Sequence, residues 1–406
     1  MRWLLLFAVG CGAAEGTGTV VYSEAGTGRV IALDVASGDS KVIDPGSFGA
    51  VAISSDRQYF AYAGADRVVK VADRNGNITA VPPGGGDCGG VPVWGPNHSV
   101  TYCISDQSGG GTVLLPTLGA MPRRVNGGPI AISADGQYFV YRQWAVTDGT
   151  SNAGDDVVEN ADGSEHRVLR ASVMDGGFFL FTPDQQHVLT PSAAGILEIA
   201  VADGSVSNLG SGAYVDPLPH DPMSNVSPDG ELLLFAGTQY VALNISTGER
   251  RYIADAPPHC GYAAFADRDH VVCVAHEDTT PPGSDAGMFQ ESLLVASGSS
   301  ITTLIAPPGT NMPCTLVAIA RTSGYAAAAC GGNATLVSLD GTVLASRAAI
   351  DVVGLARDES GIVAVAYQGQ VFFLSANGDS RQLATAISPF AFNGGDLFSP
   401  YVAYAP

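Results

Sequence analysis

The stretch Ile132-Ser-Ala-Asp-Gly-Gln-Tyr-Phe-Val-Tyr141 decides the fold of this chain, because weaker copies of it recur from one end to the other. Ile130 and Ile132 form an apolar run that leads into Asp135-Gly136, a dipeptide typical of tight reversals between antiparallel strands. Residues 138–141 are rich in β-forming side chains and predict the returning strand. The stretch therefore predicts a β-hairpin, and none of its side chains is a catalytic group.

Copies of this hairpin recur between Asp56 and Glu359 at a mean spacing of about 43 residues, a period typical of propeller blades. A second pair of strands follows each hairpin, as in Tyr240 to Ile245 with Arg251 to Ala254, and a turn separates its members. The repeating unit is therefore a four-stranded meander. The clear copies are residues 53–62, 94–102, 132–141, 181–189 and 226–235, and the weaker copies are 265–273, 319–326 and 355–363.

The two ends of the chain are incomplete in a complementary way. Residues 19–44 have the pattern of later blade strands, whereas residues 388–405 have the pattern of a blade's beginning. Joining them closes a ring and removes an exposed sheet edge. Counting by pattern gives nine blades, but propellers usually stop at eight. We therefore predict an all-β, single-domain β-propeller over residues 19–406 with eight blades favoured within a range of seven to nine.

Composition agrees with this fold class. Hydrophobic residues make up 46% of the chain and charged residues 14%, and the 51 glycines and 24 prolines suit short strands joined by turns. The net charge is −20, and the basic residues are scattered along the chain. A nucleic-acid partner needs clustered lysines and arginines, so the sequence argues against one.

The N-terminus has the pattern of an export signal. Met1-Arg2 is positively charged, Trp3 to Val9 is apolar, and Gly10-Cys11 follows. The end of this segment resembles the bacterial lipobox, with Ala8 where leucine is usual; the resemblance implies that residues 1–10 are removed and Cys11 is lipidated. A plain secretory signal is the alternative. We predict an outer-membrane lipoprotein that faces the periplasm or cell surface, held only by its lipid, with residues 11–18 as a tether.

The other six cysteines fall two to a blade in the predicted repeat register. In each pair the first cysteine lies at or just before the innermost strand, and the second lies on the returning strand of the same hairpin. Antiparallel neighbours bring such positions together, so we favour disulfides over free thiols. Disulfides imply an oxidising compartment, in agreement with export. The predicted pairs are Cys88 with Cys103, Cys260 with Cys273 and Cys314 with Cys330.

The Ser-Pro-Asp-Gly motif at residues 227–230, with looser forms at 54–57, 133–136 and 182–185, resembles the WD-type repeat of TolB and of the propeller domains attached to prolyl oligopeptidases. The chain has no G-x-S-x-G elbow, so the resemblance does not extend to peptidase activity. A weaker likeness, carried by residues 30–38 and 240–248, is to propeller lipoproteins of the outer-membrane assembly machinery. Only three tryptophans are present, so the repeats do not resemble those that bind quinones.

The sequence contains no pattern that assigns a catalytic or metal-binding residue. Gly84 to Gly89 matches G-x-G-x-x-G, but flanking prolines make it a loop. Asp148 to Glu159 has calcium-loop spacing, yet Ala153 replaces the required glycine, so an acidic solvated loop is favoured and no metal is predicted. His220 and His259 lie in proline-rich loops that could line the mouth of the ring, with a polar loop role favoured. The remaining candidates, interpreted as turn residues, are His98, His187 and His270.

Two insertions, Gln143 to His166 and Glu277 to Glu291, lengthen their repeats between the first hairpin and the second strand pair. Loops on a rigid scaffold often carry binding specificity. We therefore predict a protein-binding or scaffolding propeller with a protein partner in the cell envelope, and no cofactor. The alternatives are a propeller that binds carbohydrate or another small ligand, and a propeller enzyme of lactonase or lyase type, which is less favoured.

Lipidation predicts that the protein fractionates with membranes through Cys11 alone. The variant Cys11→Ser should appear in the soluble fraction, because the chain then lacks its acyl anchor. Fractionation with mass spectrometry of the mature N-terminus tests this. A Cys11→Ser protein that stays with membranes, or a wild-type N-terminus beyond Cys11 without lipid, contradicts the lipoprotein assignment.

Overall fold

The computed structural model describes the chain from Thr17 to Ala405 with internal gaps. No helix among these residues is long and apolar enough to cross a membrane. The described residues are 17–54, 56–64, 68–80, 86–87, 93–106, 109–125, 127–133, 135–144, 154–173, 179–182, 184–192, 195–210, 213–214, 225–227, 229, 231–236, 239–245, 247, 249–257, 260–281, 287–349, 351–356, 358–386 and 402–405.

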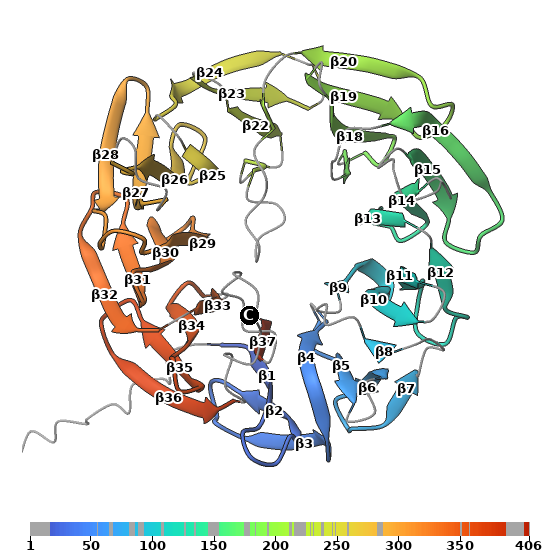
Figure 1. Cartoon of the computed structure of the whole chain (residues 1–406), viewed down its shortest axis with the longest axis horizontal. Coiled ribbons are helices and arrows are strands. Elements are labelled where there is room, and N and C mark those ends of the chain that lie inside the picture. Colours follow the sequence, from blue (N-terminus) through green and yellow to red (C-terminus); the bar gives the residue numbers. More distant parts are fainter. Residues whose placement is uncertain are drawn as a thin grey trace, which may run out of the picture.

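The described strands form nine antiparallel sheets that follow one another around a ring (Figure 1). Each sheet is one blade, so the chain is a β-propeller, but the favoured count of eight blades is wrong. The count of repeats by pattern was the better guide, because even the weakest copy, residues 319–326, belongs to a complete blade. The repeat at residues 319–326 still forms a blade although its turn lacks the acidic residue.

Blade 1 is the composite predicted from the chain ends. It contains β37 (Val402–Ala405), β1 (Thr19–Ser23), β2 (Val30–Asp34) and β3 (Ser40–Asp44). Blade 2 contains β4 (Ser47–Ile53), β5 (Tyr59–Gly64), β6 (Val69–Asp73) and β7 (Ile78–Ala80). Blade 3 contains β8 (Gly86–Asp87), β9 (Val93–Trp94), the 3-10 helix η1 (Pro96–His98), β10 (Val100–Asp106), β11 (Gly109–Leu115) and β12 (Arg123–Val125).

Blades 4 to 6 complete the middle of the chain. Blade 4 contains β13 (Gly127–Ile132), β14 (Tyr138–Trp144), β15 (Gly154–Asn160) and β16 (His166–Val173). Blade 5 contains β17 (Leu180–Phe181), β18 (His187–Ser192), β19 (Gly195–Ala200) and β20 (Val206–Gly210). Blade 6 contains β21 (Ala213–Tyr214), β22 (Leu232–Ala236), β23 (Gln239–Asn244) and β24 (Arg250–Asp255).

Blades 7 to 9 complete the ring. Blade 7 contains β25 (Cys260–Phe265), β26 (Val271–Asp278), β27 (Phe289–Ser297) and β28 (Ser300–Ile305). Blade 8 contains β29 (Cys314–Ala320), β30 (Tyr325–Cys330), β31 (Asn333–Ser338) and β32 (Val343–Ala348). Blade 9 contains β33 (Asp351–Leu355), β34 (Gly361–Val365), β35 (Gln370–Ser375) and β36 (Ser380–Thr385).

The turn in the stretch at residues 132–141 is held by side chains as well as by the backbone. The Ser133 hydroxyl accepts a hydrogen bond from the Tyr138 N–H (2.9 Å) and donates one to Asp135 Oδ1 (2.6 Å). Asp135 Oδ1 also accepts from the Gln137 N–H (3.0 Å). The hydrogen bonds from Ser133 and from the Gln137 amide lower the pKa of the Asp135 carboxyl. The motif therefore fixes both the turn and the register of the hairpin.

The same turn recurs in other blades with different residues. Ser54 with Asp56, Thr182 with Asp184 and Ser227 with Asp229 repeat the hydroxyl-to-carboxylate hydrogen bond. The residue after the aspartate is in the left-handed region at Gly136 (φ 70°) and at Arg57 (φ 62°). That conformation favours glycine, so a hairpin that has lost its glycine still folds but is strained. These turns explain why the motif tolerates degradation along the chain.

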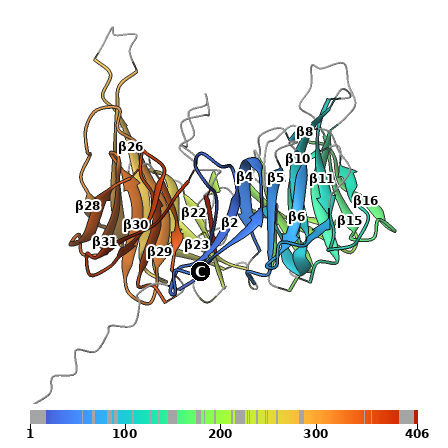
Figure 2. The same ribbon diagram turned by 90° about the horizontal axis from the view of Figure 1, so that it is seen from below.

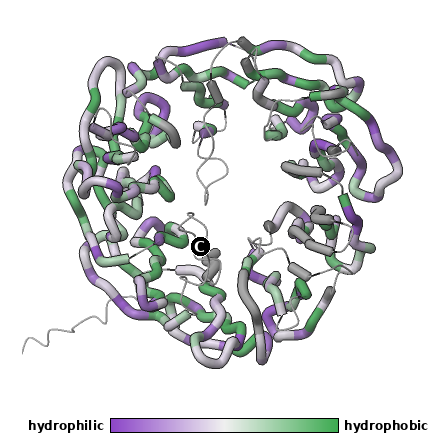
Figure 3. The backbone as a smooth tube through the Cα atoms, viewed as in Figure 1, coloured by the Kyte–Doolittle hydropathy of each residue, from purple (hydrophilic) through white to green (hydrophobic). Residues whose placement is uncertain are grey.

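Apolar side chains pack between blades. Hydrophobic segments recur around the ring, as the coloured part of Figure 3 shows. Val140 and Val158 of blade 4, for example, are buried against Val188 and Ile199 of blade 5. Alternate residues of one strand face the two neighbouring blades, because successive side chains point to opposite faces of a sheet. Each blade therefore depends on both of its neighbours to bury its faces.

The meander gives the ring two different faces. Turns between the first and second strands and between the third and fourth strands lie on one face, here called the turn face. The connections between second and third strands lie on the other, here called the loop face. β26 and β27 extend beyond the other strands on the loop face (Figure 2). The connections between β14 and β15 and between β26 and β27 belong to this face, although residues 145–153 and 282–286 lie outside the described part. The bounds predicted for the first insertion, Gln143 to His166, are wrong, because this range includes β15 (Gly154–Asn160) and the β15–β16 turn on the turn face.

The turn motif predicts that Ser133→Ala lowers the free energy of unfolding by about 1–3 kcal/mol, because it leaves the partly buried Tyr138 N–H without its acceptor. Urea denaturation measures the change. Ser300→Ala, at an exposed position in β28, is the matched control and should shift stability by less than about 0.5 kcal/mol. Equal effects of the two substitutions would show that the hydroxyl does not hold the turn.

Candidate functional site

The hairpin of β26 and β27 is the most prominent described element on the loop face. Its strands pair in continuous register from Val271 opposite Ala296 to Asp278 opposite Phe289. Beyond the last pair, the Thr279 N–H donates to the Met288 carbonyl (2.8 Å). The described stem is therefore a rigid two-stranded support for whatever residues lie at its tip.

A histidine and a glutamate face each other across this hairpin. His276 Nδ1 lies 3.0 Å from Glu291 Oε1, and the other carboxylate oxygen accepts a hydrogen bond from the Cys314 N–H of blade 8 (2.7 Å). The ring of His276 also stacks on Phe289, with 5.1 Å between ring centroids. The imidazole is thus oriented on both sides, and half of it is exposed. Nε2 of this ring has no hydrogen-bond partner among the described residues.

The segment that enters blade 8 binds the same hairpin. The Asn311 N–H donates to the Phe289 carbonyl (2.8 Å), and Asn311 Oδ1 accepts from the Phe289 N–H (2.9 Å). Two long side chains beside this segment, Met312 and Tyr367, are about half exposed. We name the surface formed by His276, Phe289, Met312 and Tyr367 the loop-face patch. It joins blades 7, 8 and 9.

Two glycines in the connection between β30 and β31 keep the patch flat. Gly331 and Gly332 both have positive φ, at 58° and 78°. A Cβ on Gly331 would lie 2.3 Å from Pro308 Cβ, and one on Gly332 would lie 3.1 Å from the Tyr367 hydroxyl. Only glycine fits both the backbone conformation and the space. The connection therefore passes between Met312 and Tyr367 without covering either side chain.

The chemistry of the loop-face patch is that of binding. It offers an oriented imidazole, an aromatic ring and a thioether, which suit hydrogen bonds and apolar contacts with a partner. In the described part of the chain, no group of three or more His, Cys, Asp or Glu side chains is placed to hold a metal ion. The histidine and glutamate that meet here were not singled out from the sequence, because only the strand register brings residues 15 positions apart into contact.

Two of the predicted disulfides are present in the structure. Cys314 and Cys330 are direct cross-strand partners with 4.0 Å between their Cα atoms. The Cα atoms of Cys260 and Cys273 lie 5.8 Å apart, on either side of a register shift between β25 and β26. Both bridges join a first strand to a second strand, as predicted. They support the base of the loop-face patch from within blades 7 and 8.

Other predicted site residues fall partly outside the described part of the chain. The lipid site, the third disulfide and the two loop histidines stay predictions, because four of their residues lie outside the described part. These are Cys11, Cys88, His220 and His259. Cys103 lies in β10, next to Ile104, which pairs with Asp87.

Three histidines lie near aspartates of hairpin turns. His98 bonds Asp56 of the preceding blade (2.7 Å). His187 lies 4.0 Å from Asp184, and His270 lies 2.8 Å from Asp267.

The two described carboxylates of the calcium-like spacing are already paired with arginines. Asp156 binds Arg142 and Arg170 on one face of β15. Glu159 binds Arg123 and the Tyr141 hydroxyl on the other face. Burial, with a contribution from Glu159, raises the pKa of this tyrosine, so its hydroxyl is a neutral donor. Carboxylates on opposite faces of a strand cannot bind one calcium ion, and the other members of the spacing lie outside the described residues.

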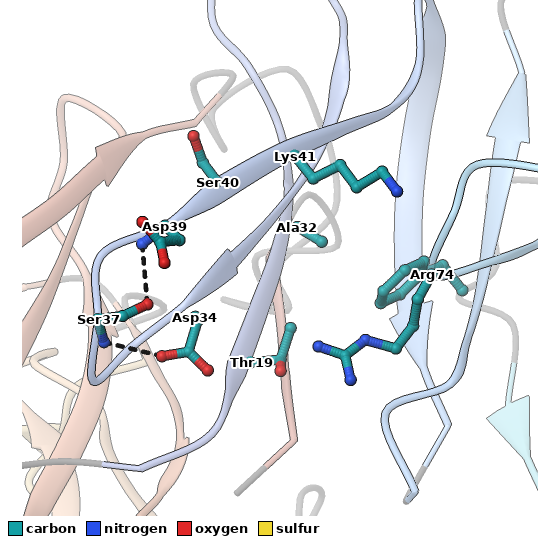
Figure 4. Close-up of a pocket in the computed structure, with 9 residues that line it drawn as sticks. Thr19, Ala32, Asp34, Ser37, Asp39, Ser40, Lys41 and Arg74 are labelled. Atoms are coloured by element: carbon teal, nitrogen blue, oxygen red, sulfur yellow. Dashed lines mark hydrogen bonds between the residues drawn. The ribbon is translucent and has the colours of Figure 1, made fainter.

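A depression of about 300 Å³ lies on the turn face between blades 1 and 2 (Figure 4). Asp34, Asp39, Lys41 and Arg74 line it, so its charges are balanced. The turn that carries Asp34 is closed by a hydrogen bond from the Ser37 N–H (2.8 Å). The Arg74 guanidinium points into the depression toward Thr19, as Figure 4 shows. This site would suit a small polar ligand.

Comparison with solved structures finds propellers of several activities. TolB from Acinetobacter baumannii is 12% identical over 71% of this chain and 66% of its own, with a TM-score of 0.30. An oligogalacturonate lyase from Vibrio parahaemolyticus is 13% identical over 90% and 97%, with a TM-score of 0.43. The dihydro-heme d1 dehydrogenase NirN is 13% identical over 92% and 74%, with a TM-score of 0.46. No protein-family model and no curated protein matches the chain.

By the strand pairing of its described residues, the chain is a nine-bladed β-propeller protein. TolB, an oligogalacturonate lyase and a dehydrogenase are among the structures it is similar to. The resemblance to TolB predicted from the turn motif concerns the fold. The identities are too low for any of these activities to be transferred to this chain. Its function has to be argued from its own residues.

The disulfides predict a defined change in stability. A Cys314→Ser/Cys330→Ser variant should lose on the order of 3 kcal/mol of unfolding free energy, because the bridge closes a loop with a sequence separation of 16 residues. Chemical denaturation with and without reductant measures this. Peptide mapping of the non-reduced protein should recover this bridge, Cys260–Cys273 and Cys88–Cys103. Bridges that join different blades would show that the register is wrong.

Proposed function

We propose that the protein is an exported binding module that holds a protein partner on the loop-face patch. The observation that carries this proposal is the β26–β27 hairpin, which extends beyond the ring and is braced by blade 8 through Asn311 and Cys314. A rigid, exposed surface costs little conformational entropy when a partner orders on it. Aromatic and methionine side chains are enriched in the centres of protein interfaces.

The charge of the chain favours a particular kind of partner. The net charge of −20 creates a field that accelerates association with a basic surface and disfavours an acidic one. The disulfides of blades 7 and 8 suit an oxidising compartment such as the periplasm. We therefore place the partner in the cell envelope and expect it to present a basic surface, with the lipid on Cys11 holding the complex at the membrane.

A small polar ligand in the turn-face depression is the second candidate function. Arg74 favours it, because its guanidinium points into the depression and has no hydrogen-bond partner among the described side chains. A carbohydrate acid or another small anion would match this donor. The two functions use opposite faces, so Arg74→Ala should leave a complex on the loop-face patch unchanged.

Site-specific photo-cross-linking tests the first function. A cross-linker placed at Phe289 or Met312 should capture one discrete envelope protein in intact cells, and the capture should weaken as salt is raised because screening reduces the steering field. A cross-linker at Met121, which is 85% exposed and lies on the turn face, is the matched control and should capture nothing discrete.

The variant Phe289→Ser/Met312→Ser should reduce co-purification of the captured partner at least about tenfold, since interface centres contribute most of the binding energy. Met121→Ser should have no effect. The proposal is wrong if the partner co-purifies equally with both variants, or if positions 121 and 289 capture the same proteins.

A further inference from the structure

Among the described residues, two buried polar atoms without hydrogen-bond partners belong to strands of the adjacent blades 4 and 5. They are Nη2 of Arg142 and the hydroxyl of Thr190, and each of these residues is only 1% exposed. An unsatisfied buried donor is unfavourable, and a charged one more so, so such atoms normally have a partner. Two of them on one interface make it a candidate binding site.

The strand register places these two side chains at one level. Val140 of β14 and Val188 of β18 belong to the same apolar cluster between the two blades. Arg142 and Thr190 each lie two residues further along equivalent second strands, which run in the same direction around the ring. Residues two apart on a strand share a face. Both side chains therefore face the interface beyond its apolar part, toward the loop face.

The charges at this level do not balance. Arg142 Nε donates to Asp156 Oδ1 (2.8 Å), and Arg170 Nε donates to Asp156 Oδ2 (2.7 Å). Asp156 is fully buried, and its two oxygens are both used by these arginines. Glu198 on β19 does not contribute, because it pairs with Leu189 on the face toward blade 6. Two guanidinium groups against one carboxylate leave a single uncompensated positive charge among the described residues.

A buried charge of this kind is costly unless an opposite charge accompanies it. Nη2 of Arg142 is a charged donor, and the Thr190 hydroxyl can also donate. Since Arg142, Asp156 and Thr190 are almost completely buried, the space suits a small ion better than an organic acid. The single excess charge suits a monovalent ion.

We propose that a small monovalent inorganic anion of halide size binds between blades 4 and 5, held by Arg142 Nη2 and the Thr190 hydroxyl. The ion completes the row formed by Arg142, Asp156 and Arg170 across β14, β15 and β16. It stabilises the contact between the two blades, because it binds only when both blades are in place. This site is independent of the loop-face patch.

Chloride and bromide are the probes. At constant ionic strength, replacing sodium gluconate by sodium chloride should raise the midpoint of thermal unfolding of the wild type by roughly 1–3 °C, because gluconate is too large for the site. The isosteric variant Thr190→Val should lose most of this difference. Thr335→Val is the matched control: it removes another buried hydroxyl, which pairs with Ser346 in blade 8, and should keep the full chloride effect.

Crystals grown in bromide should show an anomalous peak between Arg142 and Thr190 that is absent in Thr190→Val. The opposite outcome is equally clear. If the space holds only water or is empty, chloride and gluconate act alike on all three proteins, no bromide peak appears, and Thr190→Val is as stable as the wild type or more so, because it removes an unsatisfied hydroxyl. Either the missing peak or the missing chloride effect overturns the proposal.

Discussion

The pairing of β1 with β37 is the contact on which the other blades depend. Thr19 to Tyr22 pair with Ala405 to Val402, so residues from both ends of the chain build one sheet. Val20 and Tyr22 of β1 pack toward blade 9, whereas Val21 packs toward blade 2. Without this pairing, β1 would keep an unpaired edge, and the apolar faces of blades 9 and 2 that pack on this sheet would be exposed to water. Closure therefore turns nine marginal sheets into one cooperative domain.

Closure also explains where the chain can vary. The space between blades is packed with small and branched apolar side chains, and the turn face is held by repeated hydroxyl and carboxylate pairs such as Ser133 with Asp135. The loop face has no such repeated constraint. Its connections differ from blade to blade, and the β26–β27 hairpin is the described one that extends furthest. Binding specificity can develop there without a cost to the ring.

The two proposals concern different parts of the same architecture. The loop-face patch uses exposed side chains on a braced hairpin, and its disulfides lie within blades 7 and 8. The anion proposed between blades 4 and 5 binds beyond the apolar part of one interface, where Arg142 and Thr190 are polar. A buried ion is sensitive to small movements of the blades that enclose it, whereas a surface patch is not. Stability and recognition can therefore be altered separately in this protein.

The sequence by itself determined the fold class, the repeating unit, the composite blade and the pairing of Cys260 with Cys273 and of Cys314 with Cys330. All of these follow from local turn chemistry, such as Asp135-Gly136, repeated at a regular spacing. The count of repeats by this pattern was nine, which is the number of blades in the structure, although eight was favoured. The number of blades was misjudged because degenerate copies such as residues 319–326 carry a weak turn signal although their apolar strands are intact.

Only the tertiary structure decided which side chains meet across strands and between blades. His276 meets Glu291 through the register of one hairpin, and Asn311 bonds Phe289 from the next blade. Arg142 and Thr190, on strands of adjacent blades, both have a buried polar atom without a described partner. None of these residues stands in a recognisable motif. A shift of one residue in any strand would turn its side chains to the opposite face, so sites of this kind depend on register and on the packing of neighbouring blades.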